Sequence, residues 1–203
     1  MSDSFTRAEI KKFWAEWLEV NREAERSGDW GLLADCYVED ATYGWMFTPD
    51  EHFMAMGREE IRRWAVGSEM QGLECWHYDY MATVLDEENA MIVGFWKQRS
   101  GVLDDNGQEY EIRGIGGSWF GVARDTDGNL RFAWQRDWFD LGSTAHTFIE
   151  IAKSGKASQA FLERIAIPMM DMPGRYHYAD LPSTLWPPKV EEGQYITQNQ
   201  LGQ

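Results

Sequence analysis

The hydrophobic pattern of this 203-residue chain changes its period near residue 70. Before that point apolar residues mostly recur at helical spacing, as Ile10, Phe13 and Trp17 do. Between residues 75 and 140 they alternate with a period of two, which is the pattern of β-strands. Helices followed by a run of consecutive strands predict an α+β fold with a segregated antiparallel sheet.

Capping and turn residues set the expected boundaries of these elements. Residues 6–9 (Thr-Arg-Ala-Glu) have the form of a capping box, and the first helix should stop at residues 27–28. Further helices are expected at residues 30–37, 57–64, 144–153 and 157–167. Strands are expected at residues 40–46, 75–85, 90–99, 109–124 and 130–140, with a polar loop at residues 48–52. Glycines inside the strand at 109–124 predict a bulge or a strongly bent sheet.

A helix lying across a bent sheet makes a cone with an open end, which is a natural pocket. We expect one domain at residues 1–153. Residues 154–203 should form a C-terminal helix and an irregular arm that packs on the same domain or on a neighbouring subunit. The arm begins at Pro168, where the chain becomes rich in Pro, Tyr and Gly and loses its period.

The charge balance excludes several classes of partner. Nineteen basic residues against 34 acidic ones give a formal net charge of -15, which repels phosphate backbones and anionic lipid. The chain has no apolar run long enough to span a membrane and no signal-peptide pattern at its N-terminus. Two cysteines are too few for a disulfide scaffold. These features predict a cytoplasmic protein that binds neither nucleic acid nor membrane.

Tryptophan is unusually frequent, at 11 residues. These rings either fill a core or line a large apolar cavity for an aromatic ligand. Composition alone leaves both interpretations open.

Three segments of the sequence resemble the NTF2-like superfamily, specifically its SnoaL-like branch. They are Tyr-Val-Glu-Asp-Ala-Thr-Tyr-Gly-Trp at 37–45, Gly-Arg-Glu-Glu-Ile at 57–61, and Asp-Gly-Asn-Leu at 127–130 followed by Trp-Gln-Arg-Asp-Trp-Phe-Asp-Leu at 134–141. The resemblance covers about residues 6–150. It implies a cone in which a curved antiparallel sheet wraps around the long N-terminal helix. It does not imply one activity, because this fold hosts isomerases, cyclases, dehydratases, epoxide hydrolases and binding proteins.

Individual relatives imply different site residues. The resemblance to limonene-epoxide hydrolases assigns Asp137 as a catalytic Asp and Tyr43 as a pocket Tyr, but their Arg and second Asp would fall near Phe95 and Lys97. Ketosteroid isomerases have their Asp base where this chain has Trp45. Their paired acid would fall near Trp119 or Phe120, so neither acid–base set is complete.

Two other relatives fit the chain better. Dehydratases of this branch, such as scytalone dehydratase, use a His on the second sheet strand, and His77 resembles it. Cofactor-free formaldehyde lyases that act on lignin-derived diarylpropanes also belong to the superfamily. A Trp-rich, acidic chain is similar to them in character.

The strand pattern adds a candidate base. His77 and Asp79 lie two residues apart on an expected strand, so both should point to one face. A carboxylate beside an imidazole raises its basicity and orients it, as a general base requires. The alternative is a polar stripe on the outer face of the sheet.

The last expected strand places Asp137 on one face with Gln135, and Arg136 on the other face with Trp134. Arg136 either pairs with Asp137 in the cavity or stacks on outer aromatic rings. A bulge in this strand would exchange the two faces.

Two further candidates come from the other strands. Arg113 shares a face with Trp119 and is expected either to hold a substrate oxygen or to form a cross-strand ion pair. Tyr43 shares a face with Trp45 and either donates a hydrogen bond to the substrate or packs in the core. The polar residues 50–52 (Asp-Glu-His) either cap the mouth of the cone or are solvated. The four His are scattered, so no metal site is expected.

We therefore expect a cofactor-independent lyase that removes water or formaldehyde from a hydrophobic aromatic substrate. The expected catalytic residues are His77, Asp79, Asp137, Arg113 and Tyr43. The expected substrate-binding residues are Trp45, Trp119, Gln135, Arg136 and Phe95. An epoxide hydrolase that uses Asp137 and water, and a non-catalytic binder, remain as alternatives. A binder should have an apolar cavity with at most one titratable group, and a lyase should have at least two within mutual reach.

A homodimer is also expected, because the convex face of such a sheet would expose aromatic rings to water. If the inner residues are as assigned, the outer rings are those of Tyr78, Tyr80, Trp96, Tyr110, Trp134 and Trp138.

Overall fold

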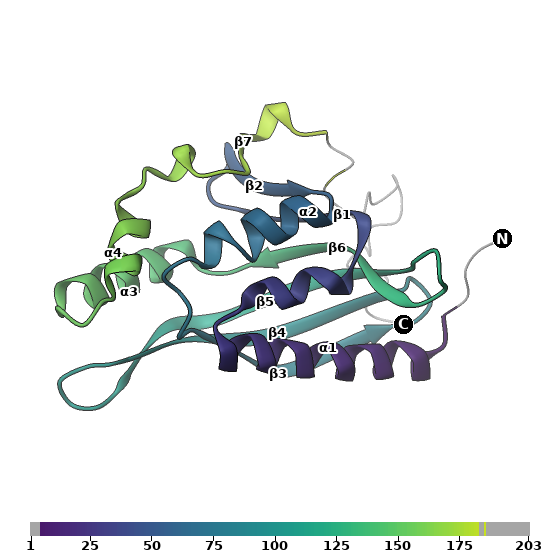
Figure 1. Ribbon diagram of the computed structural model, residues 1–203, viewed down its shortest axis with the longest axis horizontal. Helices are drawn as coiled ribbons and strands as arrows, with labels where there is room; N and C mark the ends of the chain where they lie inside the picture. The colour runs from purple at the N-terminus through teal and green to yellow at the C-terminus, as the bar shows by residue number, and fades with distance from the viewer. Residues whose placement is uncertain (1–4, 183–184, 186–203) are drawn as a thin grey trace, which may run out of the picture.

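The computed structural model describes residues 5–182 and 185 (Figure 1). The first third of the chain contains α1 (Arg7–Ser27), η1 (Trp30–Cys36), β1 (Tyr37–Met46), β2 (Glu51–Met56), α2 (Arg58–Glu60), η2 (Ile61–Ala65) and η3 (Ser68–Met70). Four long strands follow, namely β3 (His77–Asp86), β4 (Met91–Leu103), β5 (Glu109–Arg124) and β6 (Leu130–Trp138). The C-terminal part contains α3 (Leu141–Lys153), α4 (Gln159–Ala166), η4 (Met169–Asp171), β7 (Arg175–His177) and η5 (Tyr178–Asp180).

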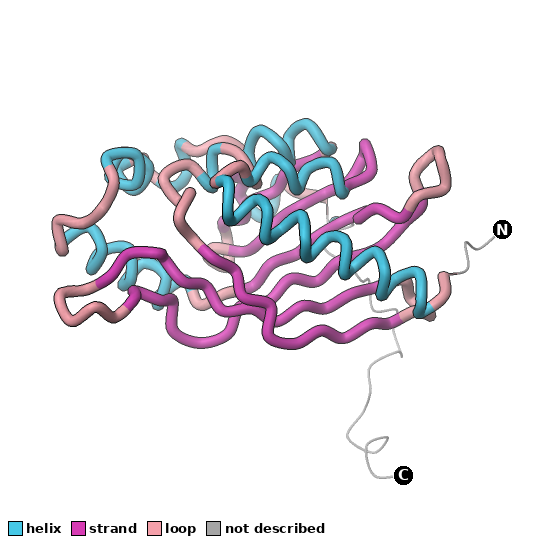
Figure 2. The backbone as a smooth tube through the Cα atoms, turned by 60° about the horizontal axis from the view of Figure 1, so that its bottom comes forward, coloured by secondary structure: helices cyan, strands magenta, loops and turns pink. Residues whose placement is uncertain are grey.

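Helix α1 begins and ends as its sequence predicts. The Thr6 side chain accepts from the Glu9 backbone N–H, the Glu9 side chain accepts from the Thr6 backbone, and Gly28 ends the helix with a left-handed φ of 72°. Ile10, Phe13 and Trp17 of the apolar stripe are buried, and Figure 2 shows α1 crossing one face of the strands diagonally. Burial of this stripe against the sheet stabilises both elements.

The strands form one curved sheet in the order β3-β4-β5-β6-β1-β2-β7. All neighbours are antiparallel except β1 and β6, which run parallel. The expected α+β cone, with the sheet around the long N-terminal helix and helices at its C-terminal end, is confirmed.

The sheet is wider than the sequence pattern predicts, because β2 and β7 were not expected. Residues 48–52 were predicted to be a polar loop, but β2 begins at Glu51, and His52 is buried at its second position. The buried His52 is therefore not solvated, which was one of the two alternatives for residues 50–52, and it is not among the residues that line the cavity. Strand β7 has only three residues and exists because it pairs with β2, with Phe53 opposite Arg175. Such pairing is tertiary and leaves no periodic signal in the sequence.

Bulges decide which face of each strand is inside. The register shifts between Tyr80 and Ala82 on β3, and opposite the Trp96–Gln98 segment of β4. The rings of Tyr78, Tyr80 and Trp96 face inward, so the prediction that they lie on the outer face is wrong. Period-two alternation separates two faces but does not say which is buried, and here both faces carry aromatic residues.

Glycines in β5 provide room for tryptophan rings on the neighbouring strands. Gly116 lies opposite Trp96, and Gly121 lies opposite Trp134. A Cβ atom on Gly116 would lie 2.0 Å from the Trp96 ring, and one on Gly121 would lie 2.1 Å from the Trp134 ring. These glycines let large rings lie flat on the sheet, and Gly114, with φ of 95°, lies within the irregular stretch of the β4–β5 pairing.

The segments after β6 close one end of the cone on their own chain. Asp140 caps α3 by accepting from the Ser143 backbone N–H. Ile151 of α3 and Phe161 of α4 are buried in a cluster with Trp76. Of the tail residues, Leu181 is buried and Tyr178 is half exposed, and Trp186 lies outside the described residues. No helix in the described part is both long and apolar enough to cross a membrane.

Candidate functional site

A cavity of about 370 Å³ lies between α1, the inner face of the sheet and the C-terminal segments. This volume falls in the range of ordinary small-molecule pockets, roughly 300–1,000 Å³. Its wall is largely aromatic, and the rings come from Trp17, Trp30, Tyr37, Tyr43, Trp45, Phe47, Tyr78, Tyr80, Trp96, Phe139 and Phe148. Both interpretations of the tryptophan content are therefore partly correct, because the same rings fill the core and line the cavity.

Asp137 is the carboxylate on the sheet side of the cavity. The Tyr43 hydroxyl donates to its Oδ2 atom at 2.6 Å, and the Gln135 side-chain amide donates to its Oδ1 atom at 2.8 Å. The Tyr37 hydroxyl in turn donates to the amide oxygen of Gln135. Because that oxygen is occupied, the Gln135 NH₂ group is oriented toward Asp137.

Ser118 supplies a third donor to the carboxylate. Its hydroxyl oxygen accepts from the Trp96 indole N–H at 2.9 Å and from the Tyr80 hydroxyl at 3.3 Å. The Gln135 amide approaches the same oxygen at 3.3 Å. With its oxygen occupied as an acceptor, Ser118 directs its own proton to Asp137.

Burial shifts both partners of the Tyr43–Asp137 pair. Burial raises the pKa of Asp137 above its ordinary value of 3.8, and hydrogen bonds from Ser118, Tyr43 and Gln135 oppose that shift. Burial, followed by the nearby Asp137 charge, raises the pKa of Tyr43 well above 10.0. At neutral pH Tyr43 is therefore a proton donor beside a carboxylate of increased basicity, which is an acid–base arrangement.

A second polar group lines the cavity on the side of the C-terminal arm. Glu69 of η3 is 5% exposed. It forms ion pairs with Arg164 of α4 at 3.1 Å and with Arg175 of β7 at 2.6 Å. The sequence offered no periodic or motif signal for this cluster, because its members come from three separate elements.

Four of the residues expected in the site line the cavity. They are Tyr43, Trp45, Gln135 and Asp137. All four lie on β1 or β6, the two strands whose inner faces the alternation assigned correctly. The Tyr43–Asp137 contact runs diagonally across the parallel β1–β6 ladder, in which Tyr43 lies opposite Gln135 and Trp45 lies opposite Asp137.

His77 and Asp79 do not face the cavity. The His77 Nδ1 atom lies 3.8 Å from Glu25, and Asp79 forms an ion pair with Arg99, which lowers the pKa of Asp79. Tyr78, between them, is the residue that lines the cavity. The structure therefore does not place the expected His–Asp base in the cavity wall, and His77 does not take the position that its resemblance to the dehydratase His implies.

The other expected residues lie on the outer face or at the edge. Arg113 is exposed, Phe95 contacts Trp138, and Trp119 contacts Trp134. Because β4 and β5 present the opposite faces to those expected, Trp96 and Ser118 take the inner positions.

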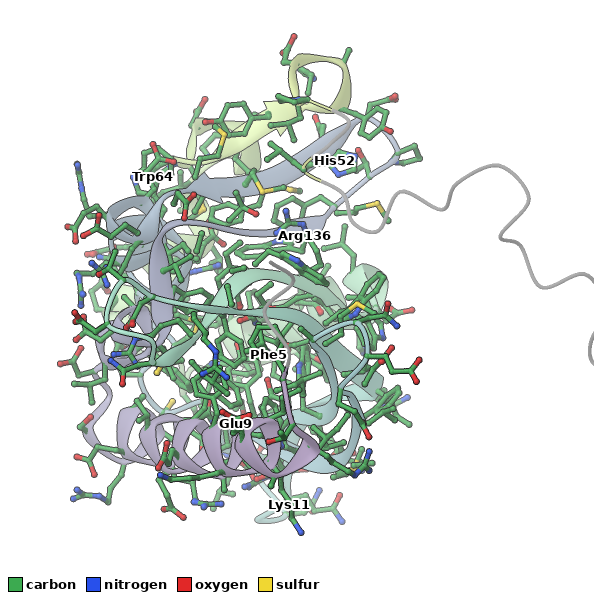
Figure 3. All side chains as sticks on the ribbon, turned by 90° about the vertical axis from the view of Figure 1, so that its right-hand side faces the viewer. Phe5, Glu9, Lys11, His52, Trp64 and Arg136 are labelled. Carbon is green, nitrogen blue, oxygen red and sulfur yellow. The ribbon has the colours of Figure 1, made fainter. Side chains whose placement is uncertain are left out.

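Arg136 is buried on the side of the sheet opposite the cavity. It donates to the backbone oxygen of Thr42 at 3.0 Å and to that of Leu185. Figure 3 shows it far from α1, in the same part of the molecule as His52. Arg136 thus joins β1 to the arm and does not touch the cavity, although the alternation separated it correctly from Asp137.

Within residues 5–182 and 185, no three His, Cys, Asp or Glu side chains are grouped closely enough to hold a metal ion.

The chain matches no protein-family model and no curated protein. Similar solved structures include an NTF2-like protein from Anabaena variabilis, at 14% identity over 69% of this chain and 96% of that one, with a TM-score of 0.49. A putative SnoaL-like polyketide cyclase from Jannaschia has 12% identity over 76% and 99%, with a TM-score of 0.48. An NTF2-like protein with a cystatin-like fold from Novosphingobium aromaticivorans has 17% identity over 68% and 86%, with a TM-score of 0.45. These likenesses concern the fold alone.

Proposed function

We propose that this protein is a cofactor-independent lyase in which Asp137 is the general base and Tyr43 its partner, acting on a hydrophobic aromatic substrate. The observation that carries the proposal is the 2.6 Å hydrogen bond between Tyr43 and Asp137 inside an aromatic cavity. The raised pKa of Asp137 makes its buried carboxylate a stronger base, and the Tyr43 phenol, whose pKa is raised well above 10.0, stays protonated as a hydrogen-bond donor.

A lignin-derived 1,2-diarylpropane-1,3-diol illustrates the step. Asp137 removes the proton of the terminal hydroxyl, and the bond between that carbon and the chain breaks, releasing formaldehyde. The electron pair of the broken bond forms a C=C bond as the benzylic hydroxide leaves. The proton held by Asp137 then joins the hydroxide to make water, which restores the carboxylate. Tyr43 stabilises the departing oxygen by donating a hydrogen bond to it.

The alternatives have weaker support. An epoxide hydrolase of the limonene type needs a second charged pair, and the inner positions of β4 are occupied by Trp96 and Gln98. A pure binder should have at most one titratable group in its cavity. Here Tyr43 and Asp137 lie within hydrogen-bond distance, and Glu69, Arg164 and Arg175 also line the wall.

A cytoplasmic location belongs to the same proposal. It is supported by the two cysteines, Cys36 and Cys75, which are both free thiols in the structure.

Turnover of a matched substrate panel tests the proposal. The protein is incubated with a 1,2-diarylpropane-1,3-diol, an aromatic epoxide and a steroid enone. Formaldehyde is measured by a colorimetric assay, and the stilbene product by its absorbance. We expect equimolar formaldehyde and stilbene from the diol, and none with the Asp137→Asn variant. Diol formation from the epoxide with no lyase product would instead support the hydrolase.

A further inference from the structure

Arg175 is a buried cation that the short strand β7 brings into the cavity wall. Its side chain is 2% exposed, and its guanidinium lies over the Phe47 ring at 4.1 Å. Strand β7 holds this position by pairing with β2, where Arg175 lies opposite Phe53. The arm therefore supplies part of the binding site as well as closing the cone.

The donors of Arg175 are only partly used. Its Nε atom donates to the Met169 backbone oxygen at 3.2 Å, and its Nη2 atom donates to Glu69 at 2.6 Å. Its Nη1 atom is buried and has no acceptor among residues 5–182 and 185. A buried donor without a partner is costly, and native proteins contain few of them outside functional sites.

The charge of the cluster is also unbalanced. The single carboxylate of Glu69 is shared by two guanidinium groups, those of Arg164 and Arg175. One positive charge therefore has no counter-charge within the cluster. Burial lowers the pKa of Arg175 from its ordinary 12.5, and the nearby Glu69 opposes that shift. Burial therefore disfavours the charged guanidinium, and a bound anion would stabilise that charge.

We propose that Nη1 of Arg175 binds a substrate carboxylate, so that the substrate preferred by this cavity is an aromatic compound that bears a carboxylate. An anionic oxygen acceptor would satisfy both the unused donor and the unbalanced charge. A carboxylate is fully ionised at neutral pH whereas an ordinary phenol is not, which favours the carboxylate. This inference rests on the proposed function in one respect, because it takes the ligand of the cavity to be the substrate on which Asp137 acts.

Binding of two nonreactive probes that have nearly the same shape but differ in charge tests the proposal. The probes are 2-naphthoate and 2-naphthamide, and their affinities are measured by isothermal titration calorimetry at neutral pH. The wild-type protein should bind the acid roughly tenfold or more tightly than the amide, as a charge-assisted hydrogen bond provides. Equal affinities would overturn the proposal without the use of any variant.

Two variants with opposite expected effects on the preference for the acid separate recognition from structural damage. Arg175→Gln should abolish the preference for the acid, and Glu69→Gln should increase it, because that substitution removes the competing anion. Structural damage would instead weaken both probes in both variants. Arg113→Gln, which removes an exposed arginine outside the cavity, is the matched control and should keep the wild-type preference. A preference that survives Arg175→Gln would contradict the assignment.

The Asp137→Asn variant distinguishes failure of this proposal from failure of the proposed function. It should retain the preference for 2-naphthoate while losing turnover. Turnover that persists in this variant would remove Asp137 as the base, and the acid-over-amide comparison would still decide the role of Arg175.

Discussion

Asp137 receives hydrogen bonds from the neutral side chains of Tyr43, Gln135 and Ser118, and burial raises its pKa. These two influences act in opposite directions, and burial is the larger. A carboxyl group whose folded pKa lies above its unfolded pKa stabilises the fold at low pH, and that contribution is lost as the pH rises through the folded pKa. The burial that makes Asp137 a stronger base therefore also lowers the stability of the fold at a pH where Asp137 is ionised.

The first prediction concerns Asp137→Asn. Asparagine cannot ionise, so the variant avoids the cost of a buried charge. The unfolding free energy of the variant minus that of the wild type should therefore be larger at pH 8 than at pH 4. Its turnover should fall by roughly 10²–10⁴-fold, the usual contribution of a general base. Urea unfolding at both pH values and steady-state kinetics measure the two effects. A stability difference that does not change with pH would show that Asp137 has an unshifted pKa.

The second prediction concerns Tyr43→Phe. The Tyr43 hydrogen bond lowers the pKa of Asp137, so its removal should raise that pKa further and shift the acid limb of the rate profile to higher pH. The turnover rate should also fall by about tenfold or more, because one charge-assisted hydrogen bond is lost. The pH dependence of kcat/KM measures the shift. Tyr110→Phe, outside the cavity wall, is the control and should leave the limb unchanged.

At the scale of the element, β5 determines how the sheet accommodates its tryptophans. Gly116 and Gly121 lie beneath the rings of Trp96 and Trp134 on opposite faces of the sheet. Trp96 is 3% exposed and donates to Ser118, so its position also orients the network around Asp137. Glycines inside a strand usually weaken it, but these two make room for rings that pack from the neighbouring strands.

The third prediction is that Gly116→Ala destabilises the protein by about 1–3 kcal/mol, because the new Cβ atom overlaps the buried Trp96 ring. Thermal or chemical unfolding measures the change. Gly142→Ala in α3 is the matched control, since a Cβ there meets only ordinary contacts and alanine favours a helix. Equal stabilities of the two variants would mean that the Trp96 ring moves aside at no cost.

At the scale of the whole molecule, the convex face of the sheet is less aromatic than the sequence pattern predicted, because Tyr78, Tyr80 and Trp96 face inward. It still exposes apolar side chains, including Val84, Ile115 and Trp138 at 55%, 59% and 41% exposure. A homodimer through this face remains our proposal.

The fourth prediction is therefore that sedimentation at micromolar concentration detects a species of twice 23.6 kDa. Ile115→Glu should dissociate it, because a charge buried in an apolar interface is costly. Ile149→Glu is the control, because Ile149 lies on α3 and is 50% exposed, and this variant should leave the mass unchanged. A monomeric wild-type protein would contradict the proposal.

The sequence by itself determined much of the framework. The capping box and apolar stripe of α1 and the alternation of the four long strands depend on local chemistry, so they were readable without a structure. The same holds for Tyr43 and Asp137, because β1 and β6 carry distinct inner and outer residues. The inward-facing Gln135 and outward-facing Arg136 illustrate that contrast.

Tertiary structure alone decided the rest. Which face of β3 to β5 is inside depends on bulges and on contact with α1, and a shift of one residue exchanges His77 for Tyr78 in the cavity. The Glu69–Arg164–Arg175 cluster joins three elements through ion pairs and through the pairing of β7 with β2. Contacts of this kind bring together residues that are up to 106 positions apart in the sequence. Local periodicity therefore carries no trace of them.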